Sequence, residues 1–161
     1  NQIAEDLKYG DKKINNEIDF LNVDSVDGFA MLINKDKFKD NLYFDENFFL
    51  YLENDDLCLR KKKENNNIYV SKKAKVQHLG ARSHSPIYEK EIEFSRNWHW
   101  MWSKFYFNKK HYGYTKALFI NSPTLITSLV KFFFYLVVCN KFKKKIYTMR
   151  FLGLLNSILL L

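Results

Sequence analysis

The stretch FFLYLENDDLCLR, residues 48–60, places an acidic cluster between two apolar segments. Glu53, Asp55 and Asp56 lie within four residues of one another, and apolar residues follow directly. Helix-forming residues run from about position 52 to 63, and three asparagines at 65–67 end the pattern, so the stretch predicts a helix. On that helix Glu53, Asp56 and Arg60 share one face, because they are spaced by three and four residues.

Two interpretations of this cluster follow from the residues alone. Acidic side chains in the first turn stabilise the N-terminal end of a helix, each by about 0.3–1 kcal/mol. An Asp56–Arg60 pair would add about 0.2–0.5 kcal/mol. Alternatively, the acids line a cleft and carry out chemistry there. An EF-hand is excluded, since its alternating acids and turn glycine are missing.

The rest of the chain predicts a mixture of extended and helical segments. Residues 26–33 combine small and apolar side chains and predict a largely buried strand. Aromatic residues at three- and four-residue spacings predict a helix over residues 89–107. Pro123 predicts the first turn of another helix, which runs to about residue 138. Shorter predicted elements are a helical turn at residues 35–40 and an extended segment at residues 68–76.

Composition and charge restrict the kind of protein. The chain has 161 residues, enough for a core, and 47% are hydrophobic, which excludes a disordered chain. The formal net charge is +8, which is compatible with nucleic acid, nucleotide phosphates or acidic lipid as a partner and does not choose among them. Cys58 and Cys139 form no CxxC motif, which argues against a disulfide framework and suits a reducing compartment. Because the chain starts at Asn1 and stops within an apolar run, we expect a fragment of a longer protein.

Three ordered blocks of sequence carry a family resemblance. They are DGFAMLINKDKF at residues 27–38, FDENFFLYLENDDLCLR at 44–60 and AKVQHLGARS at 74–83. Together they resemble the C-terminal, acceptor-side half of family 2 glycosyltransferases, which include rhamnosyl- and O-antigen-type enzymes. The resemblance covers residues 23–83 most strongly. It implies an α/β class with a partial GT-A fold, the nucleotide-diphospho-sugar transferase-like fold, over residues 1–88, followed by a helical region over residues 89–161.

The resemblance also implies a reaction. Such enzymes move a sugar from a nucleotide-diphosphate donor to a glycan or lipid-linked acceptor, usually with inversion, and a carboxylate removes the proton of the acceptor hydroxyl. Glu53 is the expected base, followed by Asp56 and then Asp55 as catalytic candidates. Asn54 occupies the position where the family has a second acid, and an amide cannot accept that proton.

A divalent metal, Mg²⁺ or Mn²⁺, is the implied cofactor, because the leaving diphosphate needs positive charge. His78 matches a family histidine that completes the metal shell together with a D-x-D motif. The chain has no convincing D-x-D triplet, so the resemblance implies that the donor-binding half is missing and that this fragment is inactive alone. A structural role for a single histidine remains an alternative.

Further site residues follow from the same resemblance. Asp27 and Gly28 would lie on the acceptor side, where the missing β-carbon lets substrate approach. A glycine in a tightly packed strand is the alternative. Arg82 and Ser83 would face the donor phosphates, and an ordinary loop is the alternative for them.

The C-terminal third interleaves aromatic and basic residues. A single-strand nucleic-acid surface uses such a pattern, but the helical spacing of the aromatics favours a core, and nucleic acid is not the expected partner. Residues 125–139 are mostly apolar and lysines follow at 141 and 143–145. This arrangement is typical of a helix lying on an anionic membrane surface; a buried helix and a membrane span remain alternatives.

The sequence therefore predicts a cytoplasmic glycosyltransferase at the inner face of the plasma membrane, with peripheral membrane contact. Its expected partners are a nucleotide-sugar donor and a glycan or lipid-linked acceptor. The alternative prediction is a basic, aromatic-rich binding module for nucleic acid or anionic membrane that performs no catalysis.

Overall fold

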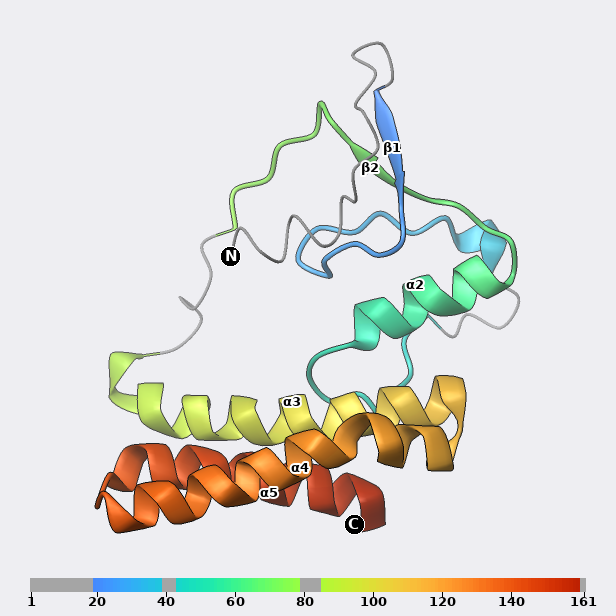
Figure 1. Cartoon of the computed structure of the whole chain (residues 1–161). Coiled ribbons are helices and arrows are strands. Elements are labelled where there is room, and N and C mark those ends of the chain that lie inside the picture. Colours follow the sequence, from blue (N-terminus) through green and yellow to red (C-terminus); the bar gives the residue numbers. More distant parts are fainter. Residues whose placement is uncertain (1–18, 39–42, 79–84, 160–161) are drawn as a thin grey trace. The chain divides into compact units, whose positions relative to one another are not determined.

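The computed structural model of the chain describes residues 19–38, 43–78 and 85–159 (Figure 1). The chain divides into two compact units. The first consists of Asn1–Asn47 and Glu53–Leu79, and the second of Phe48–Leu52 and Gly80–Leu161. The chain therefore leaves the first unit at Phe48 and returns to it at Glu53, within the acidic stretch.

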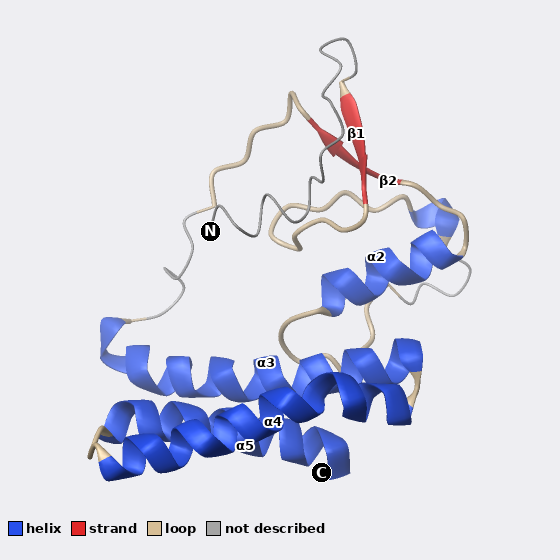
Figure 2. Cartoon of the chain, viewed as in Figure 1, coloured by secondary structure: helices blue, strands red, loops and turns tan. Residues whose placement is uncertain are grey.

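The first unit contains a small sheet and one α-helix. Strand β1 (Phe20–Val23) pairs antiparallel with β2 (Ile68–Ser71), with Phe20 opposite Ser71 and Val23 opposite Ile68. Figure 2 shows both strands in red. A short 3₁₀ turn, η1 (Lys35–Lys37), precedes helix α2 (Glu53–Lys63). Leu57 and Cys58 of α2 are buried.

Helix α2 confirms the helix predicted for the acidic stretch, and local sequence explains where it ends. Asn65 has a φ of 60°, the left-handed conformation that asparagine tolerates better than most residues. The N–H of Asn66 donates to the carbonyl of Lys61, and the N–H of Asn65 donates to that of Lys62, both at 3.0 Å. These two bonds form a Schellman motif, which satisfies carbonyls that the last helical turn leaves unpaired.

The strand predicted for residues 26–33 is wrong. That segment is irregular, with a turn at Gly28 and Phe29, while β1 lies earlier in the chain. The side chain of Leu32 is fully exposed and that of Phe29 is 52% exposed, so the apolar composition does not mark a buried strand here. The helical turn predicted at residues 35–40 is present in shorter form as η1, and the extended segment at 68–76 as β2.

The predicted α/β class with a partial GT-A fold is also wrong. The described residues contain one two-stranded antiparallel sheet and four α-helices, so helix dominates them. A GT-A-type half would require a larger sheet with strands continuing across its acceptor side. The resemblance of the three blocks to family 2 glycosyltransferases therefore stands without support from the fold.

The second unit is a layer of three long helices. They are α3 (Glu89–Tyr112), α4 (Tyr114–Val137) and α5 (Lys141–Leu159), and a 3₁₀ turn, η2 (Pro86–Tyr88), leads into α3. Each of the three contacts the other two (Figure 2). Gly113 joins α3 to α4 with a φ of 87°, a conformation that side chains disfavour. The core comprises Met101, Phe105, Ala117 and Leu154.

The segment Phe48–Leu52 belongs to this helical unit because α3 binds both its backbone and its rings. The hydroxyl of Ser103 donates to the carbonyl of Leu50 at 2.8 Å. Phe48 is buried against Tyr106, with ring centroids 4.8 Å apart. The ring of Phe49 lies 4.7 Å from that of His99, and burial lowers the pKa of His99.

Pro123 lies inside α4, so the prediction that it opens a helix is wrong. A proline at this position removes the N–H that would bond to the carbonyl of Phe119. The hydroxyl of Ser122 donates to that same carbonyl at 3.1 Å and so replaces the missing donor. This local compensation allows the helix to continue through the proline.

Gly153 fixes how closely α5 approaches α3. A β-carbon at this position would lie 2.3 Å from the carbonyl oxygen of Trp98, a backbone atom that cannot rotate away. We expect Gly153→Ala to lower the free energy of unfolding by about 2 kcal/mol, because overpacking outweighs the better helix propensity of alanine. This loss of stability is measured by thermal unfolding, monitored through the helical circular dichroism signal.

Gly28→Ala is the matched control, since a β-carbon there would meet its nearest atom, Cβ of Asn54, at an ordinary 3.7 Å. We expect that control to change stability by less than about 0.5 kcal/mol. Equal effects of the two substitutions would contradict the close approach of α5 to α3.

Candidate functional site

Two strained residues fix the point where the acidic helix begins. Tyr51 and Leu52 have φ values of 71° and 66°, in the left-handed region that non-glycine residues seldom adopt. Each such residue carries a strain of about 1–2 kcal/mol. Backbone strain of this kind is common at functional sites, where it holds a side chain in a defined position. Here the strained pair directly precedes Glu53, the first residue of α2.

Asp56 and Arg60 form the most deeply buried ion pair described in this unit. Asp56 is completely buried, and its Oδ2 accepts a hydrogen bond from Nε of Arg60 at 2.9 Å. The guanidinium also donates from Nη2 to the carbonyl of Tyr43 at 2.6 Å. The pair therefore ties α2 to the segment before it, and the carboxylate of Asp56 is committed to a structural contact.

Asn54 and Asp55 bind the loop that follows β1. The amide of Asn54 donates from Nδ2 to the carbonyl of Val26 at 2.7 Å, and Asn54 is buried. The carboxylate of Asp55 accepts a hydrogen bond from the hydroxyl of Ser25. Both side chains thus hold the residue 25–28 loop against the start of α2, the loop that contains Gly28.

Glu53 differs from its three neighbours. Its Oε2 atom is buried, yet it accepts no hydrogen bond from any residue in the described part of the chain. An unpaired buried carboxylate oxygen is costly, by roughly 1–3 kcal/mol or more. Native proteins retain such atoms rarely, and a catalytic role is one of the established reasons. Of the acids predicted to be catalytic, Glu53 alone combines burial with an unused oxygen among the described contacts.

The hydrogen bond of Asn54 requires a donor at this position, which an amide supplies and a carboxylate does not. A carboxylate at 54 would face the carbonyl of Val26 with no proton to donate. We expect Asn54→Asp to lower the free energy of unfolding of this unit by about 1–3 kcal/mol, because two acceptors would then be buried together. Urea unfolding measures the change. Asn67→Asp is the control, because Asn67 is exposed in the same unit and its side-chain oxygen accepts a hydrogen bond from Asn22, which an aspartate can also do. An equally large loss there would contradict the role of the Val26 contact.

Gly28 and Asp27 lie beside this cluster but are both exposed. A β-carbon added at Gly28 would lie 3.7 Å from Cβ of Asn54, an ordinary van der Waals contact, so Gly28 adjoins the start of α2. Gly28 lies in a turn, so the alternative of a glycine packed within a strand does not apply. The structure brings Gly28 and the Asn54 side chain together, and the role of Asp27 and Gly28 in binding an acceptor stays a prediction.

His78 is exposed, and its ring lies 4.7 Å from that of Phe29. Within residues 19–38, 43–78 and 85–159, no three histidine, cysteine or acidic side chains gather closely enough to hold a metal ion. The predicted Mg²⁺ or Mn²⁺ site at His78 depends on a D-x-D motif that this chain does not contain, so it stays a prediction. Arg82 and Ser83, the predicted phosphate-binding residues, lie outside the described residues.

Comparison with known proteins gives no independent assignment: no protein-family model, curated protein or solved structure matches this chain. The site must therefore be interpreted from its own geometry. Sequence analysis missed the contacts made by Ser25, Val26 and Tyr43. Two of these partners are backbone carbonyls, which leave no signal in the sequence.

Proposed function

We propose that this chain contributes the acceptor-side base of a glycosyltransferase, with Glu53 as the residue that receives the proton. The observation that supports it is the buried Oε2 of Glu53, which lies at the start of α2 without a described hydrogen-bond partner. The order of the three sequence blocks around it is the second support. The proposal makes no use of a GT-A fold.

The proposed step moves one sugar. The hydroxyl oxygen of the acceptor forms a bond to the anomeric carbon of the donor, and its proton passes to Oε2 of Glu53. The bond between the anomeric carbon and the diphosphate oxygen breaks, and the nucleoside diphosphate leaves with the electron pair. Attack on the face opposite the leaving group inverts the anomeric centre. Protonated Glu53 then returns its proton to solvent.

The neighbouring residues have positioning roles in this proposal. The Asp56–Arg60 pair fixes the helix, and Asn54 and Asp55 fix the loop that carries Gly28. Rigid support of this kind matters because general-base catalysis requires the carboxylate within about 2.6–3.2 Å of the proton it removes. A divalent metal would need ligands from outside the described residues, so no step is assigned to it.

Release of nucleoside diphosphate tests the proposal. The protein, encoded with any residues that precede Asn1 in its gene, is incubated with UDP-, GDP- and dTDP-linked sugars, with and without a bacterial lipid extract as the source of acceptor. We expect one donor to release nucleoside diphosphate only when the extract is present. Folded protein that releases none from any donor would contradict the proposal.

A binding role without catalysis is the second candidate, and the exposed apolar side chains of α4 favour its membrane form. The aromatic helix α3 gives less support to a nucleic-acid surface. Met101 and Phe105 are fully buried. Of the three tryptophans of α3, Trp100 is exposed and the other two are half-buried. The two candidates differ in one measurement, because a binding module releases no nucleoside diphosphate.

A further inference from the structure

Helix α4 buries small and polar side chains and exposes large apolar ones, the reverse of the usual pattern in a water-soluble protein. The side chains of α4 that are fully buried are small or polar: Ala117, Asn121 and Ser128. On α5 the buried positions include Gly153 and Ser157, and the hydroxyl of Ser157 donates to the carbonyl of Trp102 at 2.9 Å. Small residues and side-chain hydrogen bonds at helix contacts are typical of helices that associate in lipid.

The large apolar side chains of α4 point outward instead. We call this set the apolar stripe; it consists of Phe119, Ile126, Val130, Phe133, Phe134 and Val137, each at least 54% exposed. Successive members are separated by seven, four, three, one and three residues, which places them within a sector of about 100° on one face of the helix. A continuous exposed apolar surface of this kind marks an interaction site.

Three hydroxyls on α4 bond to backbone carbonyls of the helix itself. Ser122 and Thr127 are exposed, and their hydroxyls donate to the carbonyls of Phe119 and Thr124, both at 3.1 Å. Ser128 also donates to the carbonyl of Thr124, at 2.7 Å. Hydroxyls bonded to the preceding helical turn need no water, so they are compatible with an apolar environment.

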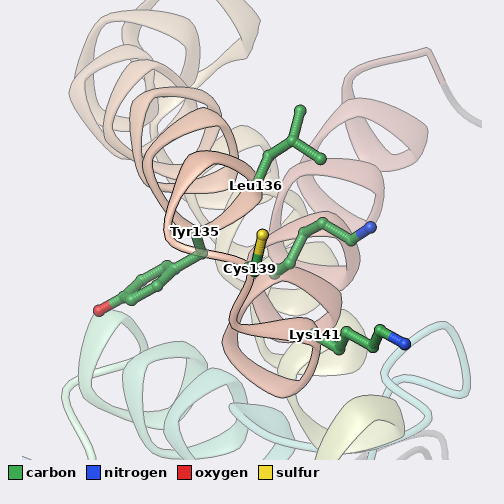
Figure 3. Close-up of a pocket in the computed structure, with 5 residues that line it drawn as sticks. Tyr135, Leu136, Cys139 and Lys141 are labelled. Carbon is green, nitrogen blue, oxygen red and sulfur yellow. The ribbon is translucent and has the colours of Figure 1, made fainter.

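Positive charge gathers where α4 meets α5. A pocket of about 160 Å³ there is lined by Tyr135, Leu136, Cys139, Lys141 and Lys144. In Figure 3 the side chain of Lys141 extends to one side and that of Tyr135 to the other, with Cys139 between them. Lys143 and Lys145 follow in the same helical turn. An apolar pocket bordered by lysines suits a lipid with an anionic headgroup.

The charge of the whole helical unit narrows the choice of partner. Between residues 94 and 161 the sequence has no aspartate or glutamate, whereas lysine and arginine recur along all three helices. Two copies of this surface would therefore bring like charges together. An anionic leaflet supplies both an apolar region for the stripe and phosphates for the lysines.

We infer that the apolar stripe of α4 and the lysines at the start of α5 form a surface that lies in an anionic phospholipid leaflet. Helix α4 is long and apolar enough to cross a membrane by length and composition, a weak indication by itself. The inference places α4 along the leaflet, because α3 packs on both α4 and α5 and carries Glu89, Glu91 and Glu93 in its first turns. Those acids would not enter the hydrocarbon.

Vesicle flotation of the whole chain tests this inference. The assay contains no sugar donor or acceptor, so its result does not depend on the proposed sugar transfer. The vesicles are phosphatidylcholine alone or with roughly 30% phosphatidylglycerol, in about 0.15 M salt. We expect binding to the anionic vesicles. The double substitution Lys141→Gln and Lys144→Gln should weaken that binding about 25-fold, about fivefold for each lysine.

The stripe is tested by Val130→Asp combined with Phe133→Asp, which should lower binding more than tenfold on both kinds of vesicle. Leu32→Asp is the matched control, since Leu32 is fully exposed in the other unit, and it should bind like the wild type. Circular dichroism checks that the variants remain helical.

Three outcomes would overturn the inference. One is a helical stripe variant that binds as well as the wild type, and another is a wild type that binds neither vesicle. The third is a wild type that forms a dimer in solution which the stripe substitutions dissociate, because the stripe would then be covered by a second copy.

Discussion

Asp56→Asn is expected to destabilise the first unit by about 3 kcal/mol. Asp56 is completely buried, and its charge is the partner of Arg60, whose side chain is 27% exposed. Removing one member of a buried pair leaves the other charge uncompensated, which destabilises by about 3–5 kcal/mol. The partial exposure of Arg60 places the expectation at the lower end of that range.

Cys58 offers a local readout of this effect. Its thiol is buried within α2, two residues after Asp56, whereas the thiol of Cys139 is exposed. In a Cys139→Ser background, labelling by a thiol reagent reports opening of the α2 region alone. We expect Asp56→Asn to accelerate labelling by roughly two orders of magnitude, or to the rate of the unfolded chain.

Asp55→Asn is the matched control, because the same change one residue earlier keeps an acceptor for Ser25 and involves a part-buried contact. Its labelling rate should stay within about fivefold of the wild type. The double variant Asp56→Asn with Arg60→Gln should recover part of the lost stability, since it removes both charges. Unchanged labelling of Asp56→Asn would show that the pair does not hold this helix.

Glu53→Gln is expected to have the opposite combination of effects. If Glu53 is the base, the amide should lower the rate of sugar transfer by about 10²–10⁴, the usual contribution of a general base. The fold should be unharmed or up to about 1 kcal/mol more stable, because a buried carboxylate oxygen without a described partner no longer has to be desolvated. A residue that caps the helix would instead lose stability on this change.

Glu46→Gln is the matched control for that variant. Glu46 is exposed, lies in the same sequence block and precedes α2 by only a few residues. Its transfer rate should stay within about twofold of the wild type. A similar loss in both variants would indicate a general effect of negative charge rather than a specific base.

Local sequence predicted the elements that local interactions create. Helix α2 begins at the acids 53, 55 and 56 and ends just before the asparagines 65–67. Helix α3 follows from the spacing of its aromatic residues. The strand expected at residues 26–33 failed because apolar composition does not ensure burial, as the full exposure of Leu32 demonstrates. The GT-A fold failed because it was carried over from a resemblance, and no pattern in the chain required a large sheet.

The site itself was only partly predictable. The helical spacing of Asp56 and Arg60 predicted their pairing, and the structure confirms it. The anchoring of Asn54 to Val26 depends on a backbone carbonyl 28 residues away, which no local pattern encodes. The buried oxygen of Glu53 likewise depends on how the chain packs around it. The sequence therefore predicted which acids form the cluster. Their contacts in the folded chain distinguish Asp55 and Asp56, which make structural contacts, from Glu53, the candidate base.

The most direct measurement is acceptor-dependent release of nucleoside diphosphate by wild type and Glu53→Gln, with Cys58 labelling recorded on the same samples. We predict that the wild type turns over one donor. The rate of Glu53→Gln should be lower by about 100-fold or more, while Cys58 stays protected from the thiol reagent. A protected Glu53→Gln variant that works at the wild-type rate would contradict the assignment of Glu53 as the base.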